Sequence, residues 1–231
     1  MAAFVFHACS KDEAIEPEIE ISDICLHINL LENNGSFAEK LNELLTHARN
    51  ENHESGYILY PSEADVFRYE AVRGEPGEAS IMFNPKEQIE GLIHNHYENL
   101  FPTFSATDIK AIYDVYKDEH MHNYATFFSG MVSPTGTAYL LKIDDLERFL
   151  LFSNQNLLDL ERFQDFERRY FETQQAYLQS MSREDSFEVA LYDLLKGPGL
   201  VYFRSTGSFG IWTRLEKDQS GYLRGVGCSA N

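Results

Sequence analysis

Residues 91–96 read Gly-Leu-Ile-His-Asn-His, and residues 104–108 read Phe-Ser-Ala-Thr-Asp. The apolar start of the first stretch predicts a buried β-strand that ends in its two histidines. Because residues i and i+2 of an extended segment point to the same side, His94 and His96 can aim their imidazoles at one point. Ser105 is a typical N-cap residue, so the second stretch predicts the start of a helix with Asp108 in its first turn.

Helical and strand patterns extend outward on both sides of these two stretches. The expected helices cover residues 37–50, 105–117, 144–180 and 183–195. The expected strands cover residues 56–60, 66–72, 80–83, 91–94, 124–132 and 137–143, with two or three more between 200 and 228. This order contains antiparallel-looking hairpins, which indicates an α+β fold rather than a doubly wound one.

Two imidazoles and one carboxylate suit zinc. His94, His96 and Asp108 would fill three positions of a tetrahedral site and leave the fourth open to water, which is the arrangement of a catalytic site. Zinc would lower the pKa of that water to about 7 and polarise a carbonyl group.

A hydrolase of this kind also needs a base for the water, and a carboxylate beside the metal is the usual solution. Glu54 stands just before the strand expected over residues 56–60 and is our candidate. Glu51, Glu63 and Glu90 are competing candidates that the sequence alone leaves open.

The ordered set of Glu54, His94, His96, Ser105 and Asp108 resembles the JAMM motif of the JAB/MPN-domain zinc metallopeptidases. That motif has an acid in a Glu-x-Gly-like start to a strand, then His-x-His, then a serine with an aspartate three residues after it. The resemblance covers residues 36–143. It implies an α+β fold with a JAB/MPN-like mixed β-sheet flanked by helices.

The resemblance also implies the chemistry. His94, His96 and Asp108 would hold the zinc, Glu54 would be the general base, and Ser105 would help to hold the tetrahedral oxyanion. The implied activity is that of a peptidase or isopeptidase, in which metal-activated water attacks an amide carbonyl of a protein or peptide substrate.

Three features depart from the family pattern. Asn95 stands between the histidines, where the family usually has Ser or Thr, and Tyr97 replaces the usual proline. The segment 97–104 is one residue longer than is common. A loop can absorb that residue without moving the following helix, so the departure bears on the oxyanion role of Ser105 more than on the metal ligands.

Composition excludes several classes of protein. The chain has 231 residues, and 19 Lys and Arg stand against 37 Asp and Glu, which gives a net charge of −18. Aromatic residues make up 13% of the chain, which a disordered protein would not reach. No apolar run approaches the roughly 18 to 20 residues of a membrane-spanning helix. The acidic balance argues against nucleic acid as a partner, since a phosphate-binding surface needs clustered Lys and Arg.

The N-terminus resembles the end of a bacterial lipoprotein signal. A short apolar run leads to Cys9 and then turns acidic, so Cys9 is a candidate lipidation site and residues 10–20 a candidate tether. This predicts peripheral attachment to the outer membrane or cell surface, outside the cytoplasm. The alternatives are a disordered start with a free thiol and a cytoplasmic location.

Cys25 and Cys228 remain as an even pair. Outside the cytosol they are expected to form a disulfide that ties the chain ends together, and the alternative is two unrelated thiols. The folded part is expected to begin near Ile21, and the first core-directed residues are expected to be Ile21, Ile24, Leu26 and Ile28.

The sequence thus suggests three parts: a lipoprotein-signal-like start and acidic tether at 1–20, a JAB/MPN-like metallopeptidase core at 21–143, and a helical and β-strand appendage packed on the core at 144–231. Two other functions compete with the peptidase. One is a non-catalytic surface binding module of the same fold, and the other is a secreted effector or toxin domain. Metal analysis of the protein and of a variant without the two histidines would separate the enzyme from the binding module.

Overall fold

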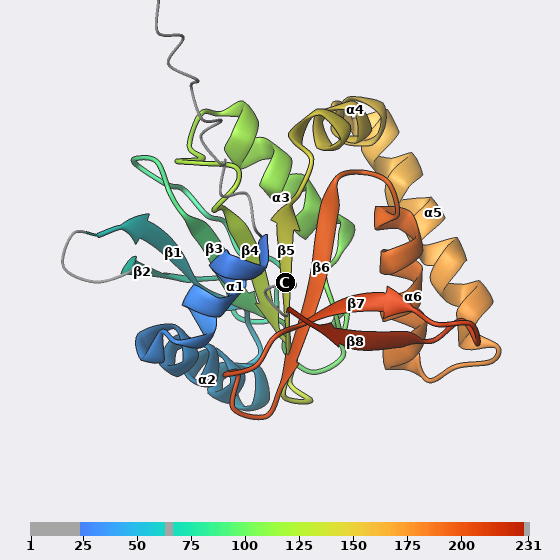
Figure 1. Cartoon of the computed structure of the whole chain (residues 1–231), viewed down its shortest axis with the longest axis horizontal. Helices are drawn as coiled ribbons and strands as arrows, with labels where there is room; N and C mark the ends of the chain where they lie inside the picture. The colour runs from blue at the N-terminus through green and yellow to red at the C-terminus, as the bar shows by residue number, and fades with distance from the viewer. Residues whose placement is uncertain (1–23, 63–66, 229–231) are drawn as a thin grey trace, which may run out of the picture.

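The computed structural model describes residues 24–62 and 67–228 (Figure 1). Within these ranges it is an α+β protein, as expected, with one mixed sheet of eight strands and six helices. The helices are α1 (Ile24–Glu32), α2 (Gly35–Asn50), α3 (Ala106–Lys117), α4 (Leu146–Asn156), α5 (Leu160–Leu178) and α6 (Arg183–Leu195). The strands are β1 (Ser55–Pro61), β2 (Phe67–Arg73), β3 (Gly91–Asn95), β4 (Phe128–Val132), β5 (Thr137–Ile143), β6 (Leu200–Thr206), β7 (Thr213–Lys217) and β8 (Leu223–Gly227).

The strands follow one another across the sheet in the order β2-β1-β3-β4-β5-β6-β7-β8. β3 and β4 run parallel, and every other neighbouring pair is antiparallel. A parallel pair needs a crossover connection, and α3 lies in the segment that joins β3 to β4. The crossover therefore carries the chain from the histidines at the end of β3 directly into the helix that contains Asp108.

Side chains of the central strands enter two separate apolar cores, one on each face of the sheet. Leu92 belongs to the core beneath α3, α4, α5 and α6, whereas the next residue, Ile93, belongs to the core beneath α1 and α2. Figure 1 shows α1 and α2 on one face and α3 on the other. Because strand side chains alternate, His94 shares the face of Leu92 and points toward α3.

The sheet continues without a break through the boundary expected at residues 143 and 144. β5 pairs with β6 along its full length, from Thr137 opposite Thr206 to Ile143 opposite Leu200. β7 and β8 then extend the same sheet. The C-terminal segment therefore contributes three strands to the sheet and three helices to its α3 face.

Three local expectations were wrong. Residues 80–83 form no strand, and the strand expected from residue 124 begins only at Phe128. The single helical region expected over 144–180 is two helices, because the chain leaves the helical conformation after Asn156 and Asp159 caps a new helix by accepting from the Arg162 N–H.

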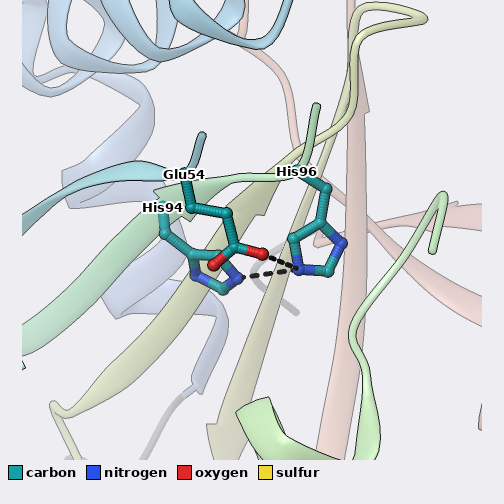
Figure 2. Close-up of side chains that lie close together, drawn as sticks. All are labelled: Glu54, His94 and His96. Carbon is teal, nitrogen blue, oxygen red and sulfur yellow. Dashed lines mark hydrogen bonds and ion pairs between the residues drawn. The ribbon is translucent and has the colours of Figure 1, made fainter. Parts of the chain in front are cut away.

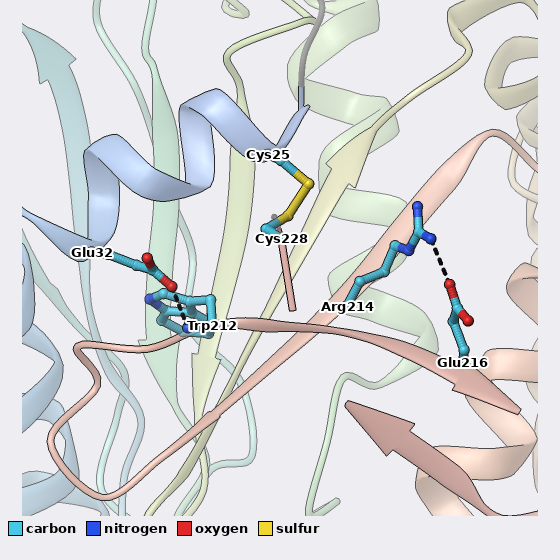
Figure 3. Close-up of a disulfide and its surroundings, with 6 residues drawn as sticks. All are labelled: Cys25, Glu32, Trp212, Arg214, Glu216 and Cys228. Atoms are coloured by element: carbon cyan, nitrogen blue, oxygen red, sulfur yellow. Dashed lines mark hydrogen bonds and ion pairs between the residues drawn. A yellow bond between two sulfur atoms is a disulfide. The ribbon is translucent and has the colours of Figure 1, made fainter. Parts of the chain in front are cut away.

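The two ends of the described chain are joined by a disulfide between Cys25 and Cys228, whose Cα atoms lie 5.1 Å apart (Figure 3). The expected pairing is present. α1 is also held at its other end, where the Trp212 backbone N–H donates to Glu32 Oε1 at 2.6 Å. The expected lipidation site, Cys9, and the expected tether lie outside the described residues.

The core-directed residues of the first element follow a helical period. Ile28 and Leu31 are fully buried, whereas Leu26 is 44% exposed. The expectation that Leu26 faces the core was wrong because residues 24–32 form a helix, in which residues three apart share a face. Ile21 lies outside the described residues.

A fully buried lysine connects α1 to the sheet. Lys142 in β5 donates from Nζ to the main-chain carbonyls of Ala125, Thr126 and Phe127 and contacts His27 Nδ1 at 2.8 Å. Burial lowers the pKa of Lys142 to about 7, and the charge of Glu90 opposes this shift.

Among the helices of the described residues, none is both long and apolar enough to cross a membrane.

Candidate metal centre

The two histidines lie at the end of a strand in the middle of the sheet. His94 is paired with Gly56 on β1 and with Met131 on β4, and the backbone N–H of His96 donates to Val132 O at 3.0 Å. These pairings fix both residues at the backbone. Their Nε2 atoms lie 3.1 Å apart, and both side chains are buried (Figure 2).

Asp108 reaches the histidines from the first turn of α3. Ser105 caps this helix: its Oγ accepts from the Asp108 N–H at 3.3 Å, while Asp108 Oδ2 accepts from the Ser105 N–H at 2.6 Å. This reciprocal capping box sets the direction of the carboxylate. Asp108 Oδ1 then lies 3.2 Å from His94 Nε2, and Oδ2 lies 3.4 Å from His96 Nε2.

Glu54 immediately precedes β1, and two close contacts between β1 and β3 fix the backbone next to it. The Ser55 N–H donates to Asn95 Oδ1 at 2.8 Å, which ties the residue after Glu54 to the end of β3. A Cβ on Gly56 would lie 2.6 Å from Ile93 O, so only glycine permits this approach of the two strands. Asn95, which departs from the family pattern, therefore helps to position the acid.

The Glu54 carboxylate points into the space between the two rings (Figure 2). Its Oε1 lies 3.8 Å from His96 Nε2, and only 5% of the residue is exposed. Of the competing acids, Glu51 pairs with His47 and His53, and Glu90 pairs with His122. Glu63 lies outside the described residues.

The separations of the ligand atoms fit a tetrahedral metal ion. Bonds of about 2.0 to 2.1 Å place neighbouring ligands of a tetrahedral ion about 3.3 to 3.4 Å apart. His94 Nε2 and His96 Nε2 lie 3.1 Å apart, and each approaches a different oxygen of Asp108: His94 lies 3.2 Å from Oδ1 and His96 lies 3.4 Å from Oδ2. Glu54, His94 and His96 also place ligand atoms within 4.8 Å of one another, so this buried cluster can bind a metal ion too.

The two sets share the histidines and differ only in the carboxylate. Asp108 lies closer to His96 Nε2 than Glu54 does, at 3.4 Å against 3.8 Å. Asp108 is also oriented by the helix cap, whereas no hydrogen bond to the Glu54 side chain is present among the described residues. The distances to His96 therefore favour Asp108 as the ligand, while Glu54 lies beside the same two histidines.

The electrostatics of the two acids differ. Burial would raise the pKa of Asp108, but the charges and hydrogen bonds of His94 and His96 lower it well below its usual range. Burial raises the pKa of Glu54, and although the histidines oppose this effect, the Asp108 charge adds to it. The surroundings thus favour the ionised form of Asp108, which is the form that binds a metal ion, and favour the protonated form of Glu54 more than its usual pKa would.

The second nitrogen of His96 has a main-chain partner. His96 Nδ1 lies 2.8 Å from Phe101 O. Because a carbonyl oxygen only accepts, Nδ1 carries the hydrogen, which leaves Nε2 as the nitrogen that would bind a metal ion. Outer contacts of this kind fix the ring and the tautomer of a metal-binding histidine.

The loop that carries this carbonyl, residues 97–104, is held by the C-terminal helices and β6. Arg183 of α6 donates to Leu100 O at 2.8 Å, and Tyr170 of α5 donates from its hydroxyl to Phe104 O at 2.9 Å. Further along the loop, Thr103 and Tyr202 share a hydrogen bond between their hydroxyl groups. The segment beyond residue 143 thus supports the site directly.

Ser105 does not direct its hydroxyl hydrogen at the metal position. Its Oγ donates to Asp108 Oδ2 at 2.8 Å, so the hydroxyl group is engaged in holding a ligand. The expected oxyanion role stays a prediction.

The sequence carries no signal for the contributions of Phe101 and Tyr170. Phe101 acts through its main-chain carbonyl, which no residue type signals. Tyr170 contacts a residue 66 positions earlier in the chain, and a contact at that distance follows only from the tertiary fold.

Comparisons with protein-family models, with curated proteins and with solved structures find no match to this chain. The functional inference therefore rests on the residues of the site.

Proposed function

We propose that the protein is a zinc-dependent JAMM-like peptidase or isopeptidase with a JAB/MPN-like fold. The observation that carries this proposal is the arrangement of His94, His96 and Asp108 at tetrahedral spacing, with the buried Glu54 beside them. A set of two histidines and one carboxylate is a known catalytic zinc set, because it leaves one position open.

The order of the surrounding elements supports the family assignment. α2 precedes Glu54, β3 ends in the histidines, Ser105 opens α3, and the antiparallel pair β4 and β5 follows. This is the sequence of elements that the resemblance to JAB/MPN-domain proteins implies for residues 36–143.

In the proposed reaction, His94, His96 and Asp108 would hold the zinc, which would supply a Lewis acid that acidifies water and polarises the substrate carbonyl. Glu54 takes a proton from the attacking water as its oxygen bonds to the carbonyl carbon. Glu54 then gives this proton to the amide nitrogen as the carbon–nitrogen bond breaks. The products are an amine and a carboxylic acid, which loses its proton to solvent at neutral pH, and Glu54 returns to its starting state.

The test combines metal analysis with peptide hydrolysis. We expect one zinc per wild-type chain and none in the double variant His94→Ala/His96→Ala. Glu54→Gln should keep its zinc and lose hydrolysis of a peptide library, followed by mass spectrometry, by about 10²- to 10⁴-fold, which is the usual contribution of a general acid or base. Glu51→Gln is the matched control, since Glu51 pairs with His47 and His53 outside the cluster.

Two results would contradict the assignment of roles. If Glu54→Gln loses zinc while Asp108→Asn keeps it, Glu54 is the ligand. If the wild-type protein holds zinc but hydrolyses no peptide in the library, the site is not that of a peptidase.

We also propose that the protein acts outside the cytoplasm, attached to the membrane surface through a lipid on Cys9. The Cys25–Cys228 disulfide supports an oxidising location, because such bonds persist outside the cytosol. Mass spectrometry of the protein from its native host tests the anchor, and a full-length chain without lipid that starts at Met1 would contradict it.

A further inference from the structure

A pocket of about 330 Å³ opens beside the candidate metal centre. Glu54, His96 and Asp108 line it, so a group bound in the pocket would lie next to the reacting atoms. Its volume is at the low end of small-molecule sites, which span about 300 to 1,000 Å³. The pocket therefore has room for a single side chain and its flanking backbone rather than for a folded partner.

Three parts of the chain supply the rest of the wall. Segment 79–83, loop 97–104 and helix α5 each contribute, and most of their side chains at the wall are apolar. These apolar residues are Ile81, Phe83, Leu100, Phe101, Tyr170 and Phe171. The wall is held in place, since the Phe101 ring packs edge-on against Phe187 with centroids 4.9 Å apart.

The charged residues of the wall all carry the same sign. Besides His96, the ionisable side chains that could carry a full charge at neutral pH are Glu54, Asp108 and Glu167, and no Lys or Arg lines the pocket. Away from the candidate metal position, an acidic side chain would meet Glu54 and Glu167 with no Lys or Arg to pair with, and burial of an unpaired charge is costly. The pocket thus selects against Asp and Glu in a bound peptide.

We infer that this pocket binds a large apolar side chain, such as Phe, Leu or Met, next to the bond that is cleaved. The substrate class is therefore a protein or peptide with such a residue beside the scissile amide, and peptides with an acidic residue there are rejected. This inference rests on the proposed peptidase function for its catalytic part, while the binding part stands on the pocket itself.

Ala111 offers a way to test the pocket without touching the metal ligands. It lies in α3 and lines the pocket, so Ala111→Phe places a ring in the space that the substrate side chain would occupy. Ala176→Phe is the matched control, because Ala176 is an exposed residue of α5 outside this pocket. Both variants should keep the zinc content of the wild-type protein.

Binding is measured first, with zinc-loaded protein and the capped single-residue amides N-acetyl-phenylalanine, N-acetyl-alanine and N-acetyl-glutamate methylamide, by saturation-transfer NMR. We expect the phenylalanine amide to bind at least about 10-fold more tightly than the other two, as burial of a large apolar side chain gives. Ala111→Phe should abolish this preference and Ala176→Phe should keep it. Equal binding of the three amides would overturn the inference.

Hydrolysis of a peptide library then separates the two proposals. Cleavage beside large apolar residues, with the preference lost in Ala111→Phe, supports both. Cleavage without that preference overturns the pocket inference and leaves the peptidase proposal standing. Selective amide binding without any cleavage supports the pocket and overturns the peptidase proposal.

Discussion

Removal of the Cys25–Cys228 disulfide should destabilise the protein by about 5 kcal/mol. The two cysteines are 203 positions apart, and the chain-entropy model gives about 5 kcal/mol at 25 °C for a closed loop of this length. α1 keeps other contacts in the folded protein, through Glu32 to Trp212 and through His27 to Lys142. The effect should therefore arise mainly in the unfolded chain.

The assay is urea unfolding of the double variant Cys25→Ser/Cys228→Ser, compared with the parent protein. Both carry Cys9→Ser, so that no third thiol can exchange with the pair. The variant should also melt about 10 to 20 °C lower, since about 1 kcal/mol corresponds to about 2 to 4 °C in a chain of this size. Reductant should reproduce the loss in the parent and have no effect on the variant.

A difference below about 1 kcal/mol between parent and variant would refute this reasoning, because it would mean that the unfolded chain gains little freedom when the bond is removed. If reductant leaves the stability of the parent protein unchanged, the two thiols do not form the bond seen in the structure.

Three further predictions concern the site and the buried lysine. Tyr170→Phe should weaken zinc binding about 10-fold, as changes outside the ligand set do, because the Tyr170 hydroxyl holds Phe104 O. Tyr177→Phe in the same helix should leave zinc binding unchanged, since the Tyr177 hydroxyl pairs with Asp193 and Lys217 instead. A competition titration with a chelating dye measures both affinities. Because the pKa of Lys142 is lowered to about 7, the folded protein loses above pH 7 a proton that the unfolded chain keeps up to about pH 10. The free energy of unfolding should therefore rise by about 2 kcal/mol from pH 7 to pH 9. Urea titrations should show this rise in the parent protein and not in Lys142→Met. Removal of zinc by a chelator should lower the melting temperature. The lost free energy of stabilisation is about 2.7 kcal/mol when free zinc had been at about 100 times its dissociation constant. The melting temperature of His94→Ala should not respond to the chelator.

The candidate site could be predicted from sequence because each of its parts follows a local geometric rule. His94 lies in β3 and His96 directly follows it in extended backbone, so the two side chains fall on one side by alternation. Asp108 occupies the N3 position of α3 by the spacing from its cap Ser105. What the spacing alone left open was which acid lies beside the histidines, and among the described acids the tertiary fold brings Glu54 to His96.

The structure of residues 80–83 could not be predicted, because alternating apolar residues occur both in a strand and in an irregular segment that covers its neighbours on one side. The run Ser-Ile-Met-Phe at residues 80–83 reads as a strand, yet it has no strand partner. Ile81 and Phe83 are apolar because they cover Gly56, where a Cβ would lie 2.9 Å from the Phe83 ring, and because they line the pocket. Met82, between them, is 83% exposed. The alternation of apolar residues therefore indicated correctly that one side of this segment is buried, but it did not specify what that side packs against.

The C-terminal segment is best understood as part of the site rather than as an addition to it. β6 pairs along the whole of β5, and through Tyr170 and Arg183 the helices hold the loop whose carbonyl accepts from His96. The same helix α5 forms one wall of the pocket. Because one element both supports a candidate ligand and borders the space for the substrate, changes in α5 would alter metal binding and substrate choice together. The candidate metal set at the end of β3 thus depends on the distant C-terminal half of the chain for its geometry.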